Sequence, residues 1–496
     1  MNRHKVTYLK VHTQDTHGAL ESVCHDRLLR HQPCLIALVH SPNMKTLVFY
    51  HYLYPDDVVS SVHFSDLCQG LVERGWEVTG YCCTRSCRDP RLTFPPATTW
   101  NGVKIKRIWR PGFSQSSSLG RLLNSAWMIA MWSLLAFNPF LRVSQLVIGT
   151  DPVMSILVAL PWKLVRPRVR IAHWCFDLYP EAAIADRLIP ENGLIAKTLI
   201  RLLKAAYRQC DLVADLGPCM KTSLTKYLGA QHSATTIPVW AIVEPEAPVS
   251  VDESERQSLF GDAKLALLYS GNFGKAHSYK EVFDVARGFS PSEAKFVFGA
   301  RGNRLGELIQ AIKTGPPNVK IAEFTTLEAL EKRLAAADVH IVTLRSEWTG
   351  AVVPSKFFGA IATGRPVLFI GSASSGIASW VKKFGVGWVL DTVFSSEATY
   401  QIEVGRIVGE LKELAEDRAR LMKLFSHCHA VYQVNFSKQR ILNQWHQELG
   451  VLAYADTESF ALGLSTVLTD STLRFENSPL LNSLYTKPFD ERGQRL

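Results

Sequence analysis

The chain has 496 residues, 47% of them hydrophobic, and its formal net charge is +10. This length and composition allow two sizeable hydrophobic cores plus extensions, so two domains are expected. The basic residues are spread along the chain rather than gathered in long runs. Nucleic-acid binding is therefore not favoured, whereas an anionic membrane surface or an anionic substrate fits such a diffuse positive charge.

The ten cysteines lack the repeated spacing of a metal site. Cys82, Cys83 and Cys87 lie close together, but neither a second cluster nor a histidine at zinc-finger distance accompanies them. Reduced, buried thiols of a cytosolic protein are therefore expected, without a metal. The opening residues supply no apolar core of a signal peptide, so no secretion signal is predicted.

The first 43 residues show no clear element apart from an apolar run at 34–39, and a second methionine, Met44, follows them. They are an extension of their own, or translation begins at Met44. The next predicted elements are a strand at 44–50, a loop at 51–57, a helix at 61–74 and a strand at 76–83. This βαβ unit is typical of a parallel sheet.

Residues 122–141 carry no charged side chain, which is unusual for a surface helix. Their length alone would allow a membrane span. Polar residues and Pro139 interrupt the stretch, and a predicted strand follows almost at once, so a buried or interfacial helix is the preferred interpretation. Trp127 and Trp132 would suit the headgroup boundary of a peripheral membrane contact.

The rest of the chain alternates strands and helices in two halves. In the first half, strands are expected at 103–109, 145–149, 169–174 and 211–216, and helices at about 193–208 and 218–228. The stretch 235–240 closes this half. A stretch with prolines and acids, 244–254, is typical of an interdomain linker. In the second half, strands are expected at 265–270, 295–299, 318–323, 338–344, 365–370 and 386–390, and helices at 327–336, 396–425 and 436–449.

The turn after the predicted strand 265–270 is the main candidate for ligand binding. It contains Gly271, Asn272, Phe273, Gly274, Lys275 and His277. A glycine-bearing turn that leads a strand into a helix exposes N–H groups, and Ser278 and Glu281 have the spacing of a capping box at the start of that helix. The turn therefore fits a diphosphate, while an ordinary strand-to-helix turn stays open as an alternative.

Four stretches together resemble a known enzyme family. They are TLVFYHYLYPDD with the helix ending LVERGWEVT, AHWCFDLYPE, LYSGNFGKAH and VVPSKFFGAIATGRPVLFIG. In this order and spacing, from about 44 to 449, the chain resembles glycosyltransferases of family 4 with the GT-B fold, in the bacterial branch that builds exopolysaccharide or O-antigen. The resemblance implies an α/β fold of two Rossmann-like domains, whose parallel sheets face an interdomain cleft.

The resemblance also implies a division of the chain into functional parts. These are an N-terminal extension (1–43), an acceptor-binding domain (44–243), a linker (244–256), a nucleotide-sugar-binding domain (257–430), a helix returning to the N-terminal domain (431–450) and a tail (451–496).

Cations and free N–H groups are needed where a nucleotide diphosphate departs. Besides the glycine turn, the candidates are Pro354, Ser355 and Lys356 at the start of a short helix, and Arg301 after a strand. Solvated surface charge is the alternative for Lys356 and Arg301.

One departure from the family pattern concerns two glutamates eight positions apart. Ala351 and Gly359 occupy the corresponding positions, and neither can hold the nucleotide's ribose through its side chain. Glu347 is a nearby substitute for this contact.

On the acceptor side, Asp177 and Glu181 follow a strand end, and Asp57 and His63 border the first loop. A carboxylate there could hydrogen-bond the acceptor or take its proton, while a helix N-cap is the alternative for Asp177. Asp177, Lys356 and His277 are the catalytic candidates.

The resulting hypothesis is a metal-independent, retaining transfer of a sugar from a UDP- or GDP-linked donor, without a further cofactor. The acceptor is a saccharide or a polyprenyl-linked saccharide at the cytoplasmic face of the membrane. A nucleotide-sugar epimerase and a catalytically silent nucleotide-sugar-binding protein are the alternatives.

Overall fold

The computed structural model describes residues 44–115, 117–229 and 233–454. The predictions for the extension 1–43 and for most of the tail after 450 therefore fall outside the described residues. Within the described part, no helix combines the length and the apolar character that a membrane crossing requires.

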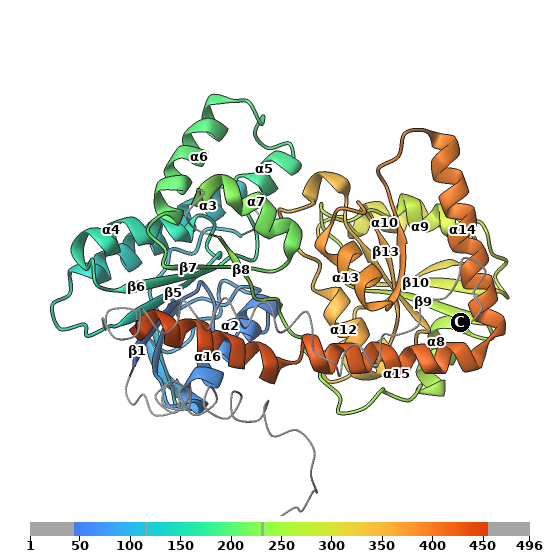
Figure 1. Ribbon diagram of the computed structural model, residues 1–496, viewed down its shortest axis with the longest axis horizontal. Helices are drawn as coiled ribbons and strands as arrows, with labels where there is room; N and C mark the ends of the chain where they lie inside the picture. Colours follow the sequence, from blue (N-terminus) through green and yellow to red (C-terminus); the bar gives the residue numbers. More distant parts are fainter. Residues whose placement is uncertain (1–43, 116, 230–232, 455–496) are drawn as a thin grey trace, which may run out of the picture. The chain divides into compact units, whose positions relative to one another are not determined.

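The first half of the chain forms an eight-stranded sheet in the order β3-β4-β2-β1-β5-β6-β7-β8 (Figure 1). All neighbouring strands are parallel except the hairpin β3–β4. The strands are β1 (Lys45–Phe49), β2 (Glu77–Cys83), β3 (Ala97–Trp100), β4 (Val103–Ile108), β5 (Gln145–Gly149), β6 (Arg170–Trp174), β7 (Leu212–Asp215) and β8 (Thr235–Thr236).

Helices cover both faces of this sheet, so its central strands are buried on both sides and consist of apolar runs. The helices are α2 (Val59–Glu73), α3 (Ser118–Leu134), η1 (Leu135–Phe137), η2 (Ser155–Val158), α4 (Ala159–Val165), α5 (Glu181–Ala185), α6 (Leu194–Tyr207) and α7 (Pro218–Leu228).

The second half forms a six-stranded parallel sheet in the order β11-β10-β9-β12-β13-β14. Its strands are β9 (Leu265–Asn272), β10 (Ala294–Arg301), β11 (Val319–Ala322), β12 (Val339–Thr343), β13 (Val367–Ile370) and β14 (Gly387–Leu390). Its helices are α8 (Glu253–Phe260), α9 (Lys280–Ala286), α10 (Leu305–Lys313), α11 (Leu330–Ala335), η3 (Ser346–Trp348), α12 (Lys356–Ala362), α13 (Gly376–Phe384), α14 (Glu397–Glu416), α15 (Arg418–Asn435) and α16 (Lys438–Tyr454). Two parallel-dominated sheets confirm the predicted α/β class.

Two local predictions were wrong. The long helix at 396–425 is two helices, because Asp417 ends α14 and its carboxylate accepts the N–H of Arg420 to cap α15. The capping box does not form, because α9 begins at Lys280 while the Ser278 hydroxyl bonds the Glu281 side chain instead. The stretch 235–240, which closes the first half, forms a strand of only two residues, β8, since Pro238 has no N–H for the ladder.

The last helix returns to the first sheet. α16 packs against α2 and β6, and the two helices lie side by side in Figure 1. The indole N–H of Trp76 donates to Nδ1 of His446 at 2.9 Å, and Gln145 donates to the carbonyl of Leu449 at 2.6 Å. The helices α15 and α16, which follow each other directly, thus contact elements of both halves.

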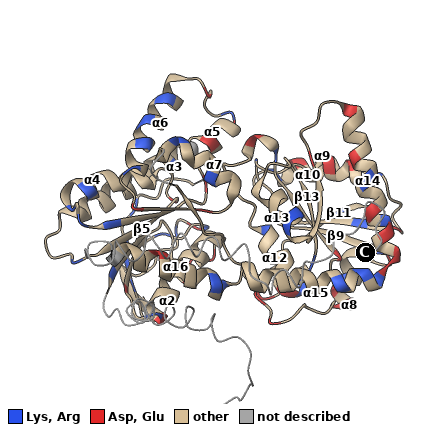
Figure 2. Ribbon diagram, in the orientation of Figure 1, with Lys and Arg blue, Asp and Glu red and all other residues tan. Residues whose placement is uncertain are grey.

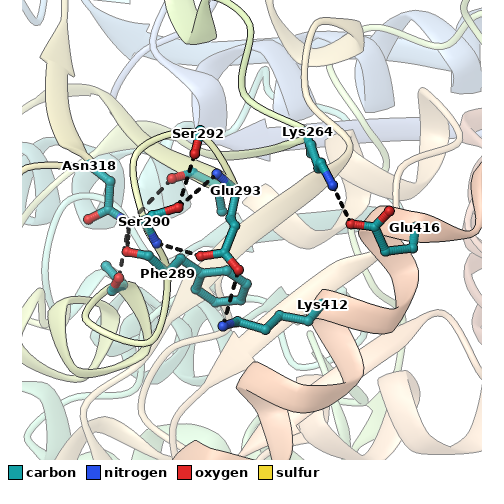
Figure 3. Close-up of polar contacts among 10 residues, drawn as sticks. Lys264, Phe289, Ser290, Ser292, Glu293, Asn318, Lys412 and Glu416 are labelled. Atoms are coloured by element: carbon teal, nitrogen blue, oxygen red, sulfur yellow. Dashed lines mark hydrogen bonds and ion pairs between the residues drawn. The ribbon is translucent and has the colours of Figure 1, made fainter.

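A polar cluster joins α14 to the loop that enters β10 (Figure 3). The buried amide of Asn318 donates to the carbonyls of Ala286, Phe289 and Ala294. The Glu293 carboxylate accepts the N–H of Ser290 and pairs with Lys412 of α14. The loop is therefore fixed by side chains where it has no regular structure of its own.

Arg365 is a buried side chain that connects several segments of the second half by hydrogen bonds. Its fully buried guanidinium donates to four main-chain carbonyls and lies 4.1 Å from the centroid of the Phe425 ring. The four carbonyls belong to Val249, Ala335, Ala337 and Thr363.

Replacing Arg365 by methionine is expected to lower the free energy of unfolding by roughly 3 kcal/mol or more, because several buried carbonyls lose their donors. Urea denaturation measures this loss. The control is Arg287→Met, which removes an exposed ion pair with Asp284 and should cost less than about 1 kcal/mol. Equal midpoints for the two variants would contradict the role of Arg365.

Candidate active site

The candidate site lies at the end of β9, near the centre of the second sheet. Gly271 adopts φ +132°, a conformation that side chains rarely adopt. A Cβ at Gly271 would lie only 2.8 Å from Cε of Lys356. Because glycine has no side chain, Lys356 at the start of α12 can lie across the strand end, with its Nζ 5.0 Å from the Tyr269 ring centroid.

His277 positions the ammonium group of Lys356. Nδ1 of the His277 ring lies 2.7 Å from the carbonyl oxygen of Thr343, so we assign the ring proton to Nδ1. Nε2 is then an acceptor, 3.2 Å from Nζ of Lys356. Burial and the neighbouring Lys356 charge hold the pKa of His277 well below its usual value. The neutral ring can therefore accept a hydrogen bond from the ammonium group.

Lys356 is a cation whose charge depends on its surroundings. Burial lowers the pKa of its ammonium group to about 7, far below the usual value for lysine. An anion placed beside Nζ would favour the charged form and raise this pKa. The group is thus suited to respond to a phosphate that enters the site.

Two cavities share Asn272 at this strand end. The first, of about 660 Å³, is lined by residues of the turn from Asn272 to His277 and by residues of α3 and α5. The second, of about 510 Å³, is lined by Asp151 and Asp177 from the first sheet and by Arg301 and Ser355 from the second. Carboxylates of one half therefore face a cation and a hydroxyl of the other half.

Asp177 lies just after β6 and faces the second cavity. The next residue, Leu178, donates its N–H to the carbonyl of Ala351 at 2.8 Å, which links the end of β6 to the segment before α12. Burial and the nearby Asp151 carboxylate, which both disfavour the charged form, raise the pKa of Asp177 to about 6. A carboxyl group with this pKa can accept a proton or a hydrogen bond near neutral pH.

His51 and Asp151, which were not predicted from the sequence, form a pair at 3.1 Å between Nδ1 and Oδ1. Burial opposes the charged ring, but the Asp151 carboxylate and the Cys83 thiol raise the pKa of His51 to about 9. His51 lies just after β1, and Asp151 lies just after β5. Each residue directly follows a predicted strand, and the two strands are parallel neighbours in the sheet. A polar residue at the carboxyl end of such a strand is the sequence signal that could have identified them.

Arg301 and Ser355 line the second cavity, as the donor assignment requires. The guanidinium carbon of Arg301 lies 4.0 Å from the Phe324 ring centroid, so the side chain is held against an aromatic face. Ser355 is exposed and precedes α12, whereas Pro354 is buried. Gly274 and Lys275 line the first cavity, where Nζ of Lys275 pairs with Asp186 at 2.7 Å.

Two predicted site residues have their polar or aromatic groups in other contacts. Phe273 is completely buried in the core of the second half, so its side chain does not reach either cavity. His63 lines the second cavity, but its ring nitrogens face the carbonyls of Val59 and Trp240 at 2.8 and 2.9 Å.

Three predicted carboxylates are engaged in local pairs. Asp57 is exposed and pairs with Arg88. Glu181 begins α5 and bonds the Tyr227 hydroxyl and Lys226. Glu347 pairs with Arg345 and lines a third cavity of about 360 Å³ beside the start of α9. The predicted residues that remain as candidates for direct contact with substrates are Lys356, His277, Arg301, Ser355 and Asp177.

Ala351 and Gly359, the two positions that depart from the family pattern, have structural roles or surroundings that need no carboxylate. Ala351 is buried and contributes its main-chain carbonyl to Leu178. Gly359 lies within α12, and a Cβ there would make an ordinary contact of 3.5 Å with Leu334. Among the described residues, no group of three or more His, Cys, Asp and Glu could hold a metal ion.

Curated proteins similar in sequence are glycosyltransferases. The chain is 22% identical over 371 residues to the probable glycosyltransferase WbjE of Pseudomonas aeruginosa, covering 73% of this chain and 84% of that protein. It is 23% identical over 180 residues to the putative colanic acid biosynthesis glycosyl transferase WcaI of Escherichia coli K12, covering 35% and 44% of the two chains. No protein-family model matches the chain.

Solved structures with a similar fold are GT-B proteins. Sucrose-phosphate synthase from Thermosynechococcus elongatus has a TM-score of 0.61 at 13% identity, over 83% of this chain and all of the other. Anabaena HepE in complex with UDP and glucose has a TM-score of 0.57 at 15% identity, over 82% and 99%. These similarities confirm the predicted GT-B fold.

Proposed function

We propose that this GT-B chain is a glycosyltransferase of polysaccharide biosynthesis that uses a UDP- or GDP-linked sugar as its donor. Its similarity to WbjE and WcaI supports this activity, and the UDP bound to HepE supports the class of donor. Four sequence stretches resemble family 4 of the glycosyltransferases, which agrees with this activity and this class of donor.

The observation that carries the proposal is the position of Lys356. Its ammonium group lies over Gly271 at the end of β9 and is hydrogen-bonded to His277. His277 lines the first cavity, and Ser355, the residue before the lysine, lines the second. A leaving diphosphate gains negative charge as its bond to the sugar breaks, and a fixed cation in a partly buried site stabilises that charge. Arg301 and the N–H groups around Gly271 would complete the contact.

In the proposed reaction the bond between the anomeric carbon and the diphosphate oxygen breaks, and its electron pair leaves with the nucleotide. The acceptor oxygen bonds to the same carbon from the same face, and its proton passes to the departing diphosphate, so the configuration is retained. Lys356 and Arg301 supply the positive charge, so the step is proposed to need neither a metal nor a further cofactor.

Asp177 is proposed to orient the acceptor hydroxyl from the opposite side of the second cavity. His63, which lines the same cavity, and Asp57 and Glu181 are further proposed contacts of the acceptor. Glu347 is proposed to contact the ribose from the third cavity. The acceptor would be a saccharide, free or carried on a polyprenyl lipid at the cytoplasmic face of the membrane.

Incubation of the purified protein with a panel of nucleotide sugars tests the activity. Release of UDP or GDP, accelerated by a suitable acceptor, is the expected result. A changed sugar without nucleotide release would indicate an epimerase, and binding without either change would indicate a silent binding protein. Both outcomes would overturn the proposal.

A further inference from the structure

An ion pair crosses from one half of the molecule to the other at the first cavity. Nζ of Lys275, in the turn after β9, lies 2.7 Å from Oδ2 of Asp186, which directly follows α5. Both residues line the first cavity, and α5 also contacts η3 of the second half. The pair therefore joins the turn that is proposed to hold the diphosphate to a carboxylate of the opposite half.

The main chain of this turn has hydrogen bonds of its own within the second half. His277 donates its N–H to the carbonyl of Gly274 at 3.0 Å, and Arg345 donates its N–H to the carbonyl of Ala276 at 2.8 Å. These bonds hold the turn from the side of its own sheet. The contact with the first half thus engages the side chain of Lys275, while the main chain of the turn is fixed independently of it.

The first half holds Asp186 in place at a cost in backbone conformation. The next residue, Arg187, has φ +58°, the left-handed conformation in which a glycine usually follows a helix end. A non-glycine residue in this conformation is strained and persists where the surrounding structure requires it. The Asp186 side chain is only 15% exposed, and a carboxylate with so little contact with water needs a cation as its partner. Lys275 is that cation.

A phosphate group would compete with Asp186 for the ammonium group of Lys275. The Lys275 side chain is 46% exposed, and its flexible stem lets the ammonium group move between partners. A diphosphate on the N–H groups of the same turn would lie beside this residue and carry more than one negative charge. The attraction between opposite charges grows with their magnitude, so the ammonium group can exchange the carboxylate for the phosphate.

We propose that Asp186 is an autoinhibitory stand-in for the donor's phosphate, which holds Lys275 in the empty site and releases it when the diphosphate binds. This inference rests on the proposed sugar transfer and specifies how its donor site is regulated. The donor must displace the carboxylate, so its apparent affinity is lower than the site would give with Lys275 free. The carboxylate takes the lysine back as the nucleotide leaves, which favours product release.

Calorimetric titration with UDP and GDP tests this competition. Asp186→Asn keeps the shape of the side chain but removes its charge. This variant should bind the nucleotide about threefold to tenfold more tightly than the original chain, because Lys275 is then free for the phosphate. Asp186→Glu keeps the charge and should return the affinity toward the original value, whereas Lys275→Ala should weaken binding. Unchanged or weaker binding by Asp186→Asn would overturn the proposal.

The Lys275→Ala background shows whether the gain depends on the lysine. In this background Asp186→Asn should change nucleotide affinity by less than about twofold, because the cation for which carboxylate and phosphate compete is absent. Titration in about 0.15 M salt screens repulsion between the carboxylate and the phosphate through solvent. An equal gain in both backgrounds would overturn the proposal, since the variant would then act through its charge alone.

Two controls separate this inference from general charge effects and from the proposed function. Glu416→Gln removes the same charge at the end of α14, a helix with both acidic and basic residues (Figure 2), where Glu416 pairs with Lys264 at 2.6 Å (Figure 3). It should bind UDP and GDP like the original chain. Uridine and guanosine lack phosphate and should not gain affinity from Asp186→Asn, and such a gain would overturn the proposal. Absence of UDP and GDP binding by the original chain would instead overturn the proposed function.

Discussion

Replacing Lys356 by alanine is expected to weaken the binding of UDP or GDP by about 30-fold to 100-fold, because a charge-assisted contact with the diphosphate is lost in a partly buried site. Turnover of the donor should fall by about a hundredfold or more, since the charge is most needed as the nucleotide departs. Isothermal titration calorimetry measures the first effect and nucleotide release the second.

Two further variants identify the cause of this loss. Lys356→Arg keeps the charge and should recover part of the affinity. Lys382→Ala, on the last turn of α13, removes an exposed lysine from the same half and should change neither value. Unchanged nucleotide affinity in the Lys356→Ala variant would show that Lys356 does not contact the nucleotide.

Gly271→Ala is expected to have the second large effect, although it changes no charge. The new Cβ would lie 2.8 Å from Cε of Lys356, and φ of +132° is strained for alanine. Displacing the lysine should lower nucleotide affinity about tenfold or more, as expected for strain of about 1–3 kcal/mol. Calorimetric titration with UDP and GDP measures the change.

A control and a double variant make this prediction specific. Gly306 lies in α10, and a Cβ added there would meet no atom within 4 Å, so Gly306→Ala should bind nucleotide normally. In the Lys356→Ala background, Gly271→Ala should cost little further affinity, because the two changes remove the same contact. Additive losses would show that Gly271 acts independently of Lys356.

The central strands of both sheets could be predicted because they are short apolar runs between turn residues. β1 and β9 are buried along most of their length, which is what such runs indicate in a parallel sheet. β3 was missed although the sequence contains its signal. Asn101 and Gly102 both adopt positive φ and form the tight turn that joins β3 to β4, and Asn-Gly is a strong indicator of a hairpin.

The pairing of site residues could not be predicted from local patterns. Lys356 and His277 are 79 positions apart and come together across the ends of β9 and β12, which the fold places side by side. His51 and Asp151 are 100 positions apart and meet for the same reason at β1 and β5. Residue type identified Lys356 and Asp177 as candidates, but only the strand order shows which groups they contact.

The most direct test of the account is proton uptake when UDP binds, measured by calorimetry in buffers of different ionisation enthalpy. With the pKa of Lys356 at about 7 in the empty site, the ammonium is largely deprotonated at pH 8, and a bound diphosphate must restore its proton. Uptake of roughly one proton per UDP is predicted at pH 8, where the phosphates are already ionised, and much less at pH 6. Lys356→Arg should abolish the uptake, since arginine is charged throughout. UDP binding at pH 8 without proton uptake, or with the same uptake in Lys356→Arg, would contradict a diphosphate site built on Lys356.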